Sequence, residues 1–484
     1  MGTSTGESSL REHTGRIRHL DAARARRLVG LFARPVVTDG HAVAIHPDDS
    51  IAAATDGELT LARVADDGPP TVVGHYKTHL YLHELLRLPL SVARELARHR
   101  GHLYLDKLTH LTEAVATELA GHDRGGLSLN NLGRLSVGAA LALGRHGGEL
   151  SLNRLRRLHP DVALGLAAHA HPLYLSGLER LSSATAAALA QHRGDLHLDA
   201  LATLSGAAAR HLARHAGKLH LHGLVCLTDA VAKAFGHRRG FLCIKHVQHL
   251  TEYQAECLSL HTGELHLYDL DIDDTVSDLL GRHTGSLSVR LPDTLPLHRL
   301  AAIVQHRGPL QLSGIRTIDH TRAAVIAAQP APHGAAGLSG IFLGDVTTLS
   351  PAVAAILATH RAGGLALFGL KAVSEDMARE LVKHPILSLD GVASLTDRVA
   401  GILATHSGAT LSLRGLRHVT AAALATLRAN PGIELPRRLL EPPTRPTAAA
   451  PPPSRAQLIA AIAAIARRGE EALHCDPPPH DGPA

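Results

Sequence analysis

Residues 196–218 read LHLDALATLSGAAARHLARHAGK, one copy of a unit that recurs with small changes from about Leu59 to near Leu435. Most copies begin 23 residues apart, as from Leu173 to Leu196. With the first leucine as position 1, leucine also fills positions 3, 6, 9 and 17, and histidine fills position 20. A fixed period of this length predicts a repeat architecture, in which each copy, here called a coil, buries its apolar edge against the next.

Each coil is predicted to begin with a short strand and to continue as a helix. Leu150, Ser151 and Leu152 alternate apolar and variable residues, which is the period of a half-buried strand. A hydroxyl near position 10 can cap the helix, proline suits its first turn, and glycine near position 22 is expected to close it. The expected caps and first-turn prolines are Thr112, Ser182, Thr228, Ser350, Thr396, Pro160 and Pro351. The fold class is therefore α/β, with parallel strands on the concave face of a horseshoe and short helices on its convex face.

The pattern L-x-L-x-x-L-x-x-L at Leu150, Leu152, Leu155 and Leu158 resembles the leucine-rich repeat family, and it covers residues 80–435, about three quarters of the chain. The resemblance implies a scaffold that binds a protein on its concave strand face. This chain has leucine, as at Leu155, where the family usually has asparagine or cysteine, so the asparagine ladder of the family is expected to be absent. Much alanine and arginine with little lysine suggests a bacterial gene.

Six segments are expected along the chain. They are a basic N-terminal helical segment (1–35), a β-rich N-terminal cap with a degenerate first repeat (36–79), the solenoid (80–435), a Pro-rich linker (436–453), a C-terminal helix (454–473) and a disordered tail (474–484). The cap is expected to cover the sheet edge. Gly, Pro and Ala between Gln329 and Gly340 predict an irregular loop, either functional or a tolerated insertion.

Charge and motif content restrict the function. The net charge is only +5 in 484 residues, so binding a polyanion would need a local concentration of charge. No apolar run approaches the roughly 20 residues of a membrane helix, and no secretory signal is evident. Four cysteines without a C-x-x-C pair favour a reducing cytoplasm. No phosphate-binding, nucleophile-elbow or H-E-x-x-H motif is present, so we expect no catalytic residue, metal, cofactor or small-molecule substrate. We also expect the chain to be a monomer.

The candidate partner-binding residues occupy positions 2 and 4 of the strands, where side chains point away from the leucines and cover the concave face. These columns hold six of the 11 tyrosine and phenylalanine residues of the chain. Aromatic anchors at an exposed face suit protein recognition, although aromatic residues also favour strands. The candidates are Tyr81, His83, Tyr104, Asp106, Tyr174, His197, Asp199, His220, His222, His266, Tyr268, Arg290, Phe342 and Phe368.

The arginines near the N-terminus support an alternative function. A basic amphipathic helix there would dock on nucleic acid or an anionic membrane surface, or it would only cover the open end of the stack with its arginines in solvent. The candidate polyanion-binding residues are Arg16, Arg18, Arg24, Arg26 and Arg27.

A histidine column runs through position 20. A metal or proton ladder would need carboxylate or thiolate ligands at fixed spacing, whereas a ring at each helix end can cap the last carbonyls. We therefore interpret the column as structural, and expect repulsion between close rings to lower several pKa values. Its members are His99, His122, His146, His169, His192, His215, His261, His283, His306, His360, His384 and His406.

Overall fold

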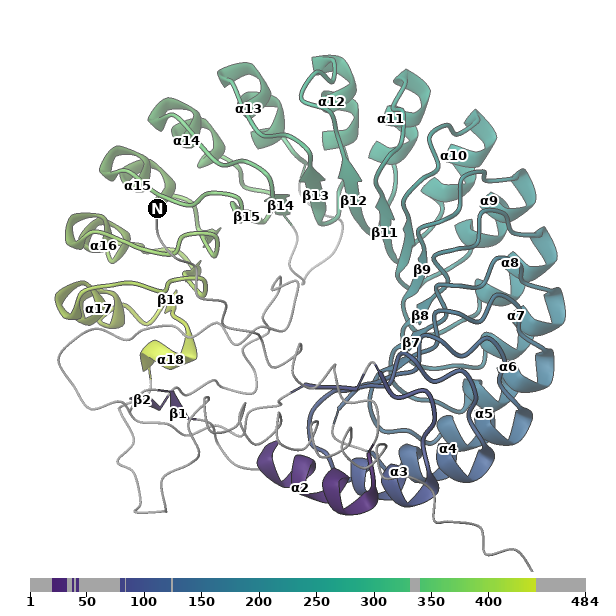
Figure 1. The fold of residues 1–484 in the computed structure, drawn as a ribbon. Helices are drawn as coiled ribbons and strands as arrows, with labels where there is room; N and C mark the ends of the chain where they lie inside the picture. The colour runs from purple at the N-terminus through teal and green to yellow at the C-terminus, as the bar shows by residue number, and fades with distance from the viewer. Residues whose placement is uncertain are drawn as a thin grey trace, which may run out of the picture. The chain divides into compact units, whose positions relative to one another are not determined.

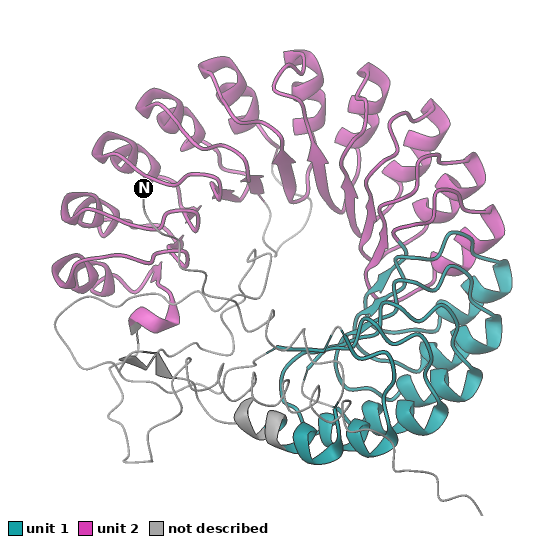
Figure 2. Ribbon diagram, in the orientation of Figure 1, with its two compact units in different colours: residues 1–198, 442–484 teal, residues 199–441 magenta. Residues whose placement is uncertain are grey.

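The computed structural model describes residues 20–32, 37–38, 41–42, 79–82, 84–122, 125–330 and 340–440. The chain falls into two compact units (Figure 2), of which unit 1 comprises residues 1–198 with 442–484, and unit 2 comprises residues 199–441. Most of the linker expected at 436–453, the C-terminal helix and tail expected after it, most of the expected N-terminal cap and residues 331–339 of the expected loop lie outside the described residues. Helix α18 (Arg437–Leu440) occupies the start of the expected linker. The predicted segment boundaries stay predictions.

Unit 1 is a stack of parallel two-residue strands, each followed by a helix (Figure 1). The strands pair leucine to leucine, as in Leu150↔Leu173 and Leu173↔Leu196, so the register follows the repeat directly. The strands are β3 (Leu80–Tyr81), β4 (Leu103–Tyr104), β5 (Leu127–Ser128), β6 (Leu150–Ser151), β7 (Leu173–Tyr174) and β8 (Leu196–His197). The helices are α3 (Leu90–Leu96), α4 (Glu113–Ala120), α5 (Val137–Leu143), α6 (Pro160–Ala167) and α7 (Ser183–Leu189).

Unit 2 continues the same strand–helix alternation, with strands of two to five residues. Its strands form the inner layer and its helices the outer layer (Figure 1). The strands are β9 (Leu219–Leu221), β10 (Leu242–Ile244), β11 (Glu264–Leu267), β12 (Ser286–Arg290), β13 (Leu310–Ser313), β14 (Gly340–Leu343), β15 (Gly364–Ala366), β16 (Ile386–Ser388), β17 (Thr410–Ser412) and β18 (Ile433–Glu434). The helices are α8 (Gly206–Leu212), α9 (Asp229–Gly236), α10 (Glu252–Ser259), α11 (Asp274–Gly281), α12 (Leu297–Val304), α13 (His320–Ala327), α14 (Pro351–Leu357), α15 (Glu375–Leu381), α16 (Asp397–Leu403), α17 (Ala421–Arg428) and α18 (Arg437–Leu440).

The core consists of leucine rows between the strand and helix layers. Leu150 and Leu152 are fully buried and Leu155 is 1% exposed, as the strand period requires. On the helix side, alanine at position 14 is fully buried, as Ala163 is in α6 and Ala186 in α7. These small side chains let neighbouring helices pack closely, so the period of 23 residues places large and small core residues in alternating rows.

The predicted helix caps are confirmed with one exception. The hydroxyls of Thr112, Ser182, Ser350 and Thr396 each accept a hydrogen bond from the amide three residues later. Thr228 stands at the same place but its side chain makes no such bond. Pro160 and Pro351 begin their helices as expected.

The glycines near position 22 do not close the helices, which corrects our expectation. The only described glycines with positive φ are Gly314, Gly340 and Gly363, and the helix ends are right-handed. A Cβ on Gly148 would instead lie 1.9 Å from the Gly125 carbonyl oxygen, in the preceding coil. Glycine is needed here because the backbones of neighbouring coils approach closely.

One helix and two strands precede unit 1's stack. Helix α2 (Ala22–Phe32) packs against α3, and its Ala25 is buried together with Leu20, which precedes the helix. Strands β1 (Val37–Thr38) and β2 (His41–Ala42) pair antiparallel. No helix in the described ranges is long and apolar enough to cross a membrane.

Candidate binding sites on the strand face

Three columns of side chains share the exposed face of the strands. Positions 2 and 4 were predicted to lie there, and the structure adds the residue before each coil, called position 0. His102, Glu149 and Phe241 stand at position 0, and each contacts position-2 or position-0 residues of other coils. The sequence signal for this column was available, because the alternation of the strand extends one step before its first leucine.

Position 4 carries a polar ladder, although we expected none. The Asp106 side chain accepts a hydrogen bond from the Asn130 amide at 3.0 Å, Asn130 accepts from Asn153 at 3.0 Å, and Asn153 accepts from Ser176 at 2.9 Å. Each bond satisfies a backbone amide just past the end of a strand. The same contact joins Asp199 to the His222 amide and Asp390 to the Arg414 amide. In the leucine-rich repeat family the ladder is formed at the position that leucine fills in this chain, whereas here it lies at position 4. Asp106 and Asp199 therefore help to hold neighbouring coils together.

In unit 1, aromatic side chains of neighbouring coils stack on the strand face. The Tyr81 and Tyr104 rings lie 4.4 Å apart and nearly parallel, and His102 stacks on Tyr104 at the same distance. Tyr174 and His197 form a similar pair at 4.3 Å. Tyr81 is buried beneath its neighbours, whereas the other four rings are partly exposed. Predicted candidates and one position-0 residue thus make two aromatic stacks.

The absence of a side chain at Gly126 lets His102 and Glu149 meet across a coil. His102 Nδ1 and Glu149 Oε1 are 3.0 Å apart although the coil that begins at Leu127 separates their coils. A Cβ on Gly126 would lie 2.1 Å from the His102 ring and 2.5 Å from Glu149 Cγ, so no other residue fits here without displacing the pair. The hydrogen bond from His102 is the main cause that lowers the pKa of Glu149, and Tyr174 adds a further bond.

In unit 2, Phe241 is the centre of a second ring cluster. Its centroid lies 4.9 Å from that of His220 and 4.6 Å from that of His266. Lys218 Nζ stands 5.2 Å from the Phe241 centroid, within range of a cation–π contact. Both nitrogens of His266 are engaged, Nε2 with Glu264 at 2.6 Å and Nδ1 with the Tyr268 hydroxyl at 3.1 Å.

Beside this cluster, three potential metal ligands converge. His220 and His222 point to the same side of β9, and the strand register sets Cys243 of β10 directly beside His220. One ligand atom from each lies within 4.8 Å of the other two. His222 Nδ1 is also 3.1 Å from Asp199 Oδ1. Burial raises the pKa of the Cys243 thiol to about 12.

The remaining strand-face candidates are spread over unit 2. Phe342 and Phe368 stack at 6.2 Å, and Phe368 is among the exposed large apolar side chains. Arg290 at the end of β12 is exposed. His83 lies outside the described residues.

The N-terminal arginines are only partly described. Arg26 donates two hydrogen bonds to Glu95 of α3, and Arg24 pairs with Asp21 on its own segment. Arg16, Arg18 and the side chain of Arg27 lie outside the described part of the chain. The contact with Glu95 holds α2 on α3, which favours the covering role among the two interpretations of this helix.

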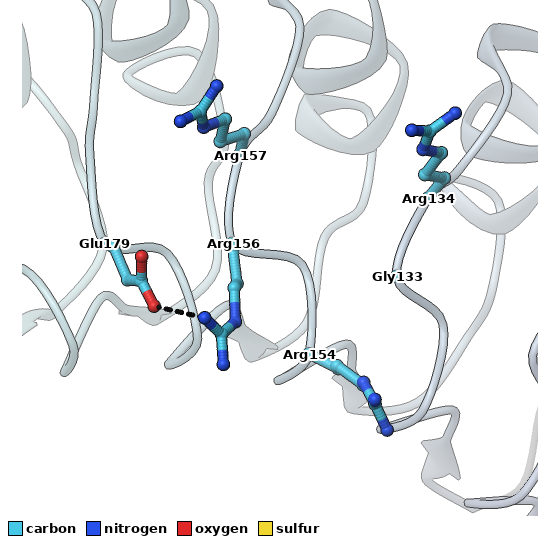
Figure 3. Close-up of a pocket in the computed structure, with 6 residues that line it drawn as sticks. All are labelled: Gly133, Arg134, Arg154, Arg156, Arg157 and Glu179. Carbon is cyan, nitrogen blue, oxygen red and sulfur yellow. Dashed lines mark ion pairs between the residues drawn. The ribbon is translucent and has the colours of Figure 1, made fainter.

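A second basic patch lies on the turns between strands and helices of unit 1. An open cavity of about 420 Å³ is lined by Gly133, Arg134, Arg154, Arg156, Arg157 and Glu179. Arg156 pairs with Glu179 at 3.2 Å, and Arg154 bonds to the Asn131 side chain. The four guanidinium groups point in different directions (Figure 3), so they do not converge on one point.

Histidines of the position-20 column contact the preceding coil. His122 Nε2 bonds to the Gly101 carbonyl at 2.9 Å, and His406 Nε2 bonds to the His384 carbonyl at 3.0 Å, both in the preceding coil. Neighbouring rings stack 5.5–6.2 Å apart, as His283 and His306 do at 5.5 Å. The rings therefore brace the previous coil, whereas we expected them to cap their own helices.

The predicted lowering of histidine pKa values is confirmed, but its main cause differs from the one expected. Burial is the largest effect, and repulsion from neighbouring rings adds to it in part of the column. The pKa falls to about 3 at His146 and His283, and to about 4 at His169, His261, His306, His360 and His384.

Comparison with known proteins finds solved structures of low sequence identity to this chain. No family model matches the chain, and no curated protein matches it. A leucine-rich-repeat protein of Leptospira interrogans is 14% identical with a TM-score of 0.34, covering 72% of this chain and 93% of that one. Toll in the Drosophila Toll–Spatzle complex is 14% identical with a TM-score of 0.35, covering 74% and 45%. An internalin of Listeria monocytogenes is 12% identical with a TM-score of 0.23, covering 71% and 81%.

The fold assignment rests on the coils themselves. The parallel register follows the leucine period, the leucine rows are buried, and a helix follows each strand. The chain is thus a leucine-rich-repeat-like protein, built as an α/β solenoid.

Proposed function

We propose that this chain is a non-enzymatic scaffold whose strand face binds another protein. The observation that carries the proposal is the pair of aromatic stacks in unit 1, Tyr81–Tyr104–His102 and Tyr174–His197. Rings held against one another lose little conformational freedom when a partner covers them, which makes them efficient anchors. The exposed Phe368 beside Phe342 offers a further anchor in unit 2.

We further propose that the scaffold is a monomer in a bacterial cytoplasm. Cys226, Cys243 and Cys257 are free thiols, which fits a reducing compartment. Acidic and basic groups on the strand face are paired with each other, as in His102–Glu149 and His266–Glu264. Such pairing fixes the rings and supports a recognition surface.

The test is affinity capture from native lysate at low and high salt. The bait is the full chain or its Tyr81→Ala/Tyr104→Ala/Tyr174→Ala form. We expect a partner that stays bound to the wild-type chain at high salt. The triple substitution should reduce the captured amount of this partner at least roughly tenfold, since anchor residues dominate binding energy.

The matched control removes apolar surface from the helix side. Leu141, Leu164 and Tyr253 are exposed there, so their triple alanine form should keep the partner. Because Tyr81 is buried, circular dichroism must show that the tyrosine variant is folded. Equal retention of the partner by wild type and folded tyrosine variant would contradict the proposal.

The alternative is docking on a polyanion through arginines. The specific observation for it is the patch of Arg134, Arg154, Arg156 and Arg157, which has one carboxylate for four guanidinium groups. In the same capture, binding that ignores the tyrosines, disappears at high salt and fails in an Arg154→Gln/Arg157→Gln form would favour this function. Loss instead in an Arg16→Gln/Arg18→Gln form would place it at the N-terminus.

A further inference from the structure

The clearest convergence of metal-ligating side chains on the strand face is made by His220, His222 and Cys243. His220 lies in β9 and His222 follows the last residue of that strand, two positions further along the chain. Cys243 pairs in register with His220 on the neighbouring strand β10. Two imidazoles and one sulfur thus reach one point from two adjacent strands, with their ligand atoms within 4.8 Å of one another.

We propose that His220, His222 and Cys243 form a binding site for one zinc ion. Imidazole and thiolate are the ligands that zinc prefers, at about 2.0–2.1 Å for nitrogen and about 2.3 Å for sulfur. A tetrahedral ion with these bonds holds its ligand atoms roughly 3.3–3.6 Å apart. The observed separation is at most 4.8 Å, so the ligand atoms would have to approach by up to roughly 1.2–1.5 Å as the ion binds.

Asp199 completes the arrangement by orienting one of the ligands. Its Oδ1 lies 3.1 Å from His222 Nδ1, so the Nδ1 proton is directed to the carboxylate and Nε2 is left to ligate the ion. The same Asp199 oxygen accepts the His222 backbone amide at 3.4 Å, which fixes strand and ring together. A carboxylate behind a histidine is the arrangement that orients metal-bound imidazoles.

The surroundings favour a soft cation over a hard one. Phe241 packs on His220 at 4.9 Å and shields one side of the cluster from water. No carboxylate is within the ligand set, so Mg²⁺ and Ca²⁺, which need several oxygen ligands, do not fit. As zinc binds, the Cys243 thiol loses its proton to solvent and the zinc–sulfur bond forms. Three protein ligands leave a fourth position for water.

The ligand pattern was not visible as a motif. Along the chain it reads H-x-H followed 21 residues later by a lone cysteine, from His222 to Cys243. Only the parallel register of β9 and β10 brings these residues together. The sequence alone therefore predicted no metal site, although three ligating side chains meet in the fold. The site is independent of the protein-binding proposal, because its ligands can bind an ion without any partner.

The experiment uses Co²⁺ as a spectroscopic substitute for zinc in the purified full chain. A cobalt–thiolate bond gives a charge-transfer absorption that histidine-only binding cannot give, which matters in a chain with 37 histidines. We expect this absorption to saturate at one ion per chain and to disappear on adding Zn²⁺. Cys243→Ser should abolish it, and Asp199→Asn should weaken binding about 10–100-fold.

Controls separate the site from other thiols and from misfolding. Cys257→Ser removes a buried cysteine on α10 and should leave the absorption intact. His222→Asn keeps the thiol and should still lose most of the affinity, while circular dichroism reports the fold. Absence of the thiolate band in the wild type, or its persistence in Cys243→Ser, would overturn the proposal.

Discussion

At the residue scale, the fold is decided by where side chains are missing as much as by where they are present. Gly148 and Gly285 lie against a carbonyl of the preceding coil so closely that a Cβ would stand 1.9 Å from its oxygen. The neighbour is backbone, which cannot rotate out of the way as a side chain can. Coil spacing therefore depends on glycine in this row.

The Gly285→Ala substitution tests this dependence. Its Cβ would meet the Gly263 oxygen, so the free energy of unfolding should fall by about 1–3 kcal/mol. Gly401 is the matched control, because it lies inside α16 and a Cβ there would have no atom within 4 Å. Gly401→Ala should raise stability by about 0.5–1 kcal/mol. Urea unfolding followed by circular dichroism gives both values, and equal effects would refute the argument.

At the element scale, the position-20 column acts as a series of braces between helix ends. Where histidine is replaced, another donor keeps the contact. Arg238 is buried and donates to the His215 and Gly217 carbonyls, and Gln329 donates to the His306 and Gly308 carbonyls. Part of the column thus places a hydrogen-bond donor against the previous coil, as His122 and His406 do, and stacked rings fill other places such as His146 and His169.

The column makes stability depend on pH. Burial lowers the folded-state pKa of His146 and His283 to about 3, below the value of about 6.5 for unfolded histidine. Their contribution is present above pH 6.5 and is lost as pH falls towards those folded values, by at most about 1.4 kcal/mol per pH unit for each group. We expect the melting temperature to fall between pH 8 and pH 5. A flat or rising melting temperature would contradict this.

A single substitution tests how much one histidine contributes to this pH dependence. Gln329 shows that glutamine serves at position 20, so His283→Gln keeps a donor and removes one titrating ring. This variant should lose less stability than the wild type between pH 8 and pH 5. An equal loss of stability in the two proteins would contradict this account.

At the scale of the whole molecule, the stability of the chain is additive along the repeat. Leu150 pairs with Leu173 and Leu173 with Leu196, so each coil presents the same edge to both neighbours. Long-range order then comes from a series of nearest-neighbour contacts. A complete coil is the smallest segment that can be exchanged or removed with the register preserved.

Deleting residues 173–195 tests this additivity, because it joins Pro172 to Leu196 and restores the pattern. We expect helical content per residue to be unchanged and the melting temperature to fall by only a few degrees, since one nearest-neighbour interface is lost. The control deletion of residues 173–181 removes strand β7 but keeps helix α7 and its cap Ser182, and it should abolish cooperative unfolding. Similar melting curves for the two deletions would show that cooperative unfolding does not depend on the register of the repeat.

Much of the fold could be predicted because its rules are local. Leucine spacing identified the strands, and hydroxyl residues such as Ser182 identified helix starts. The candidate sites were less predictable. The position-0 residues His102 and Glu149 were missed, and they meet only because Gly126 leaves space between their coils.

The sequence by itself determined the repeat, the alternation of strand and helix, and the residues of the core, since these follow from periodicity within one coil. Tertiary structure alone decided which side chains of different coils touch. The register of β9 and β10 sets Cys243 beside His220, and close coil packing turns position 20 into a brace on the preceding coil. The physical reason is that such contacts depend on the spacing and register between coils, which no single coil encodes.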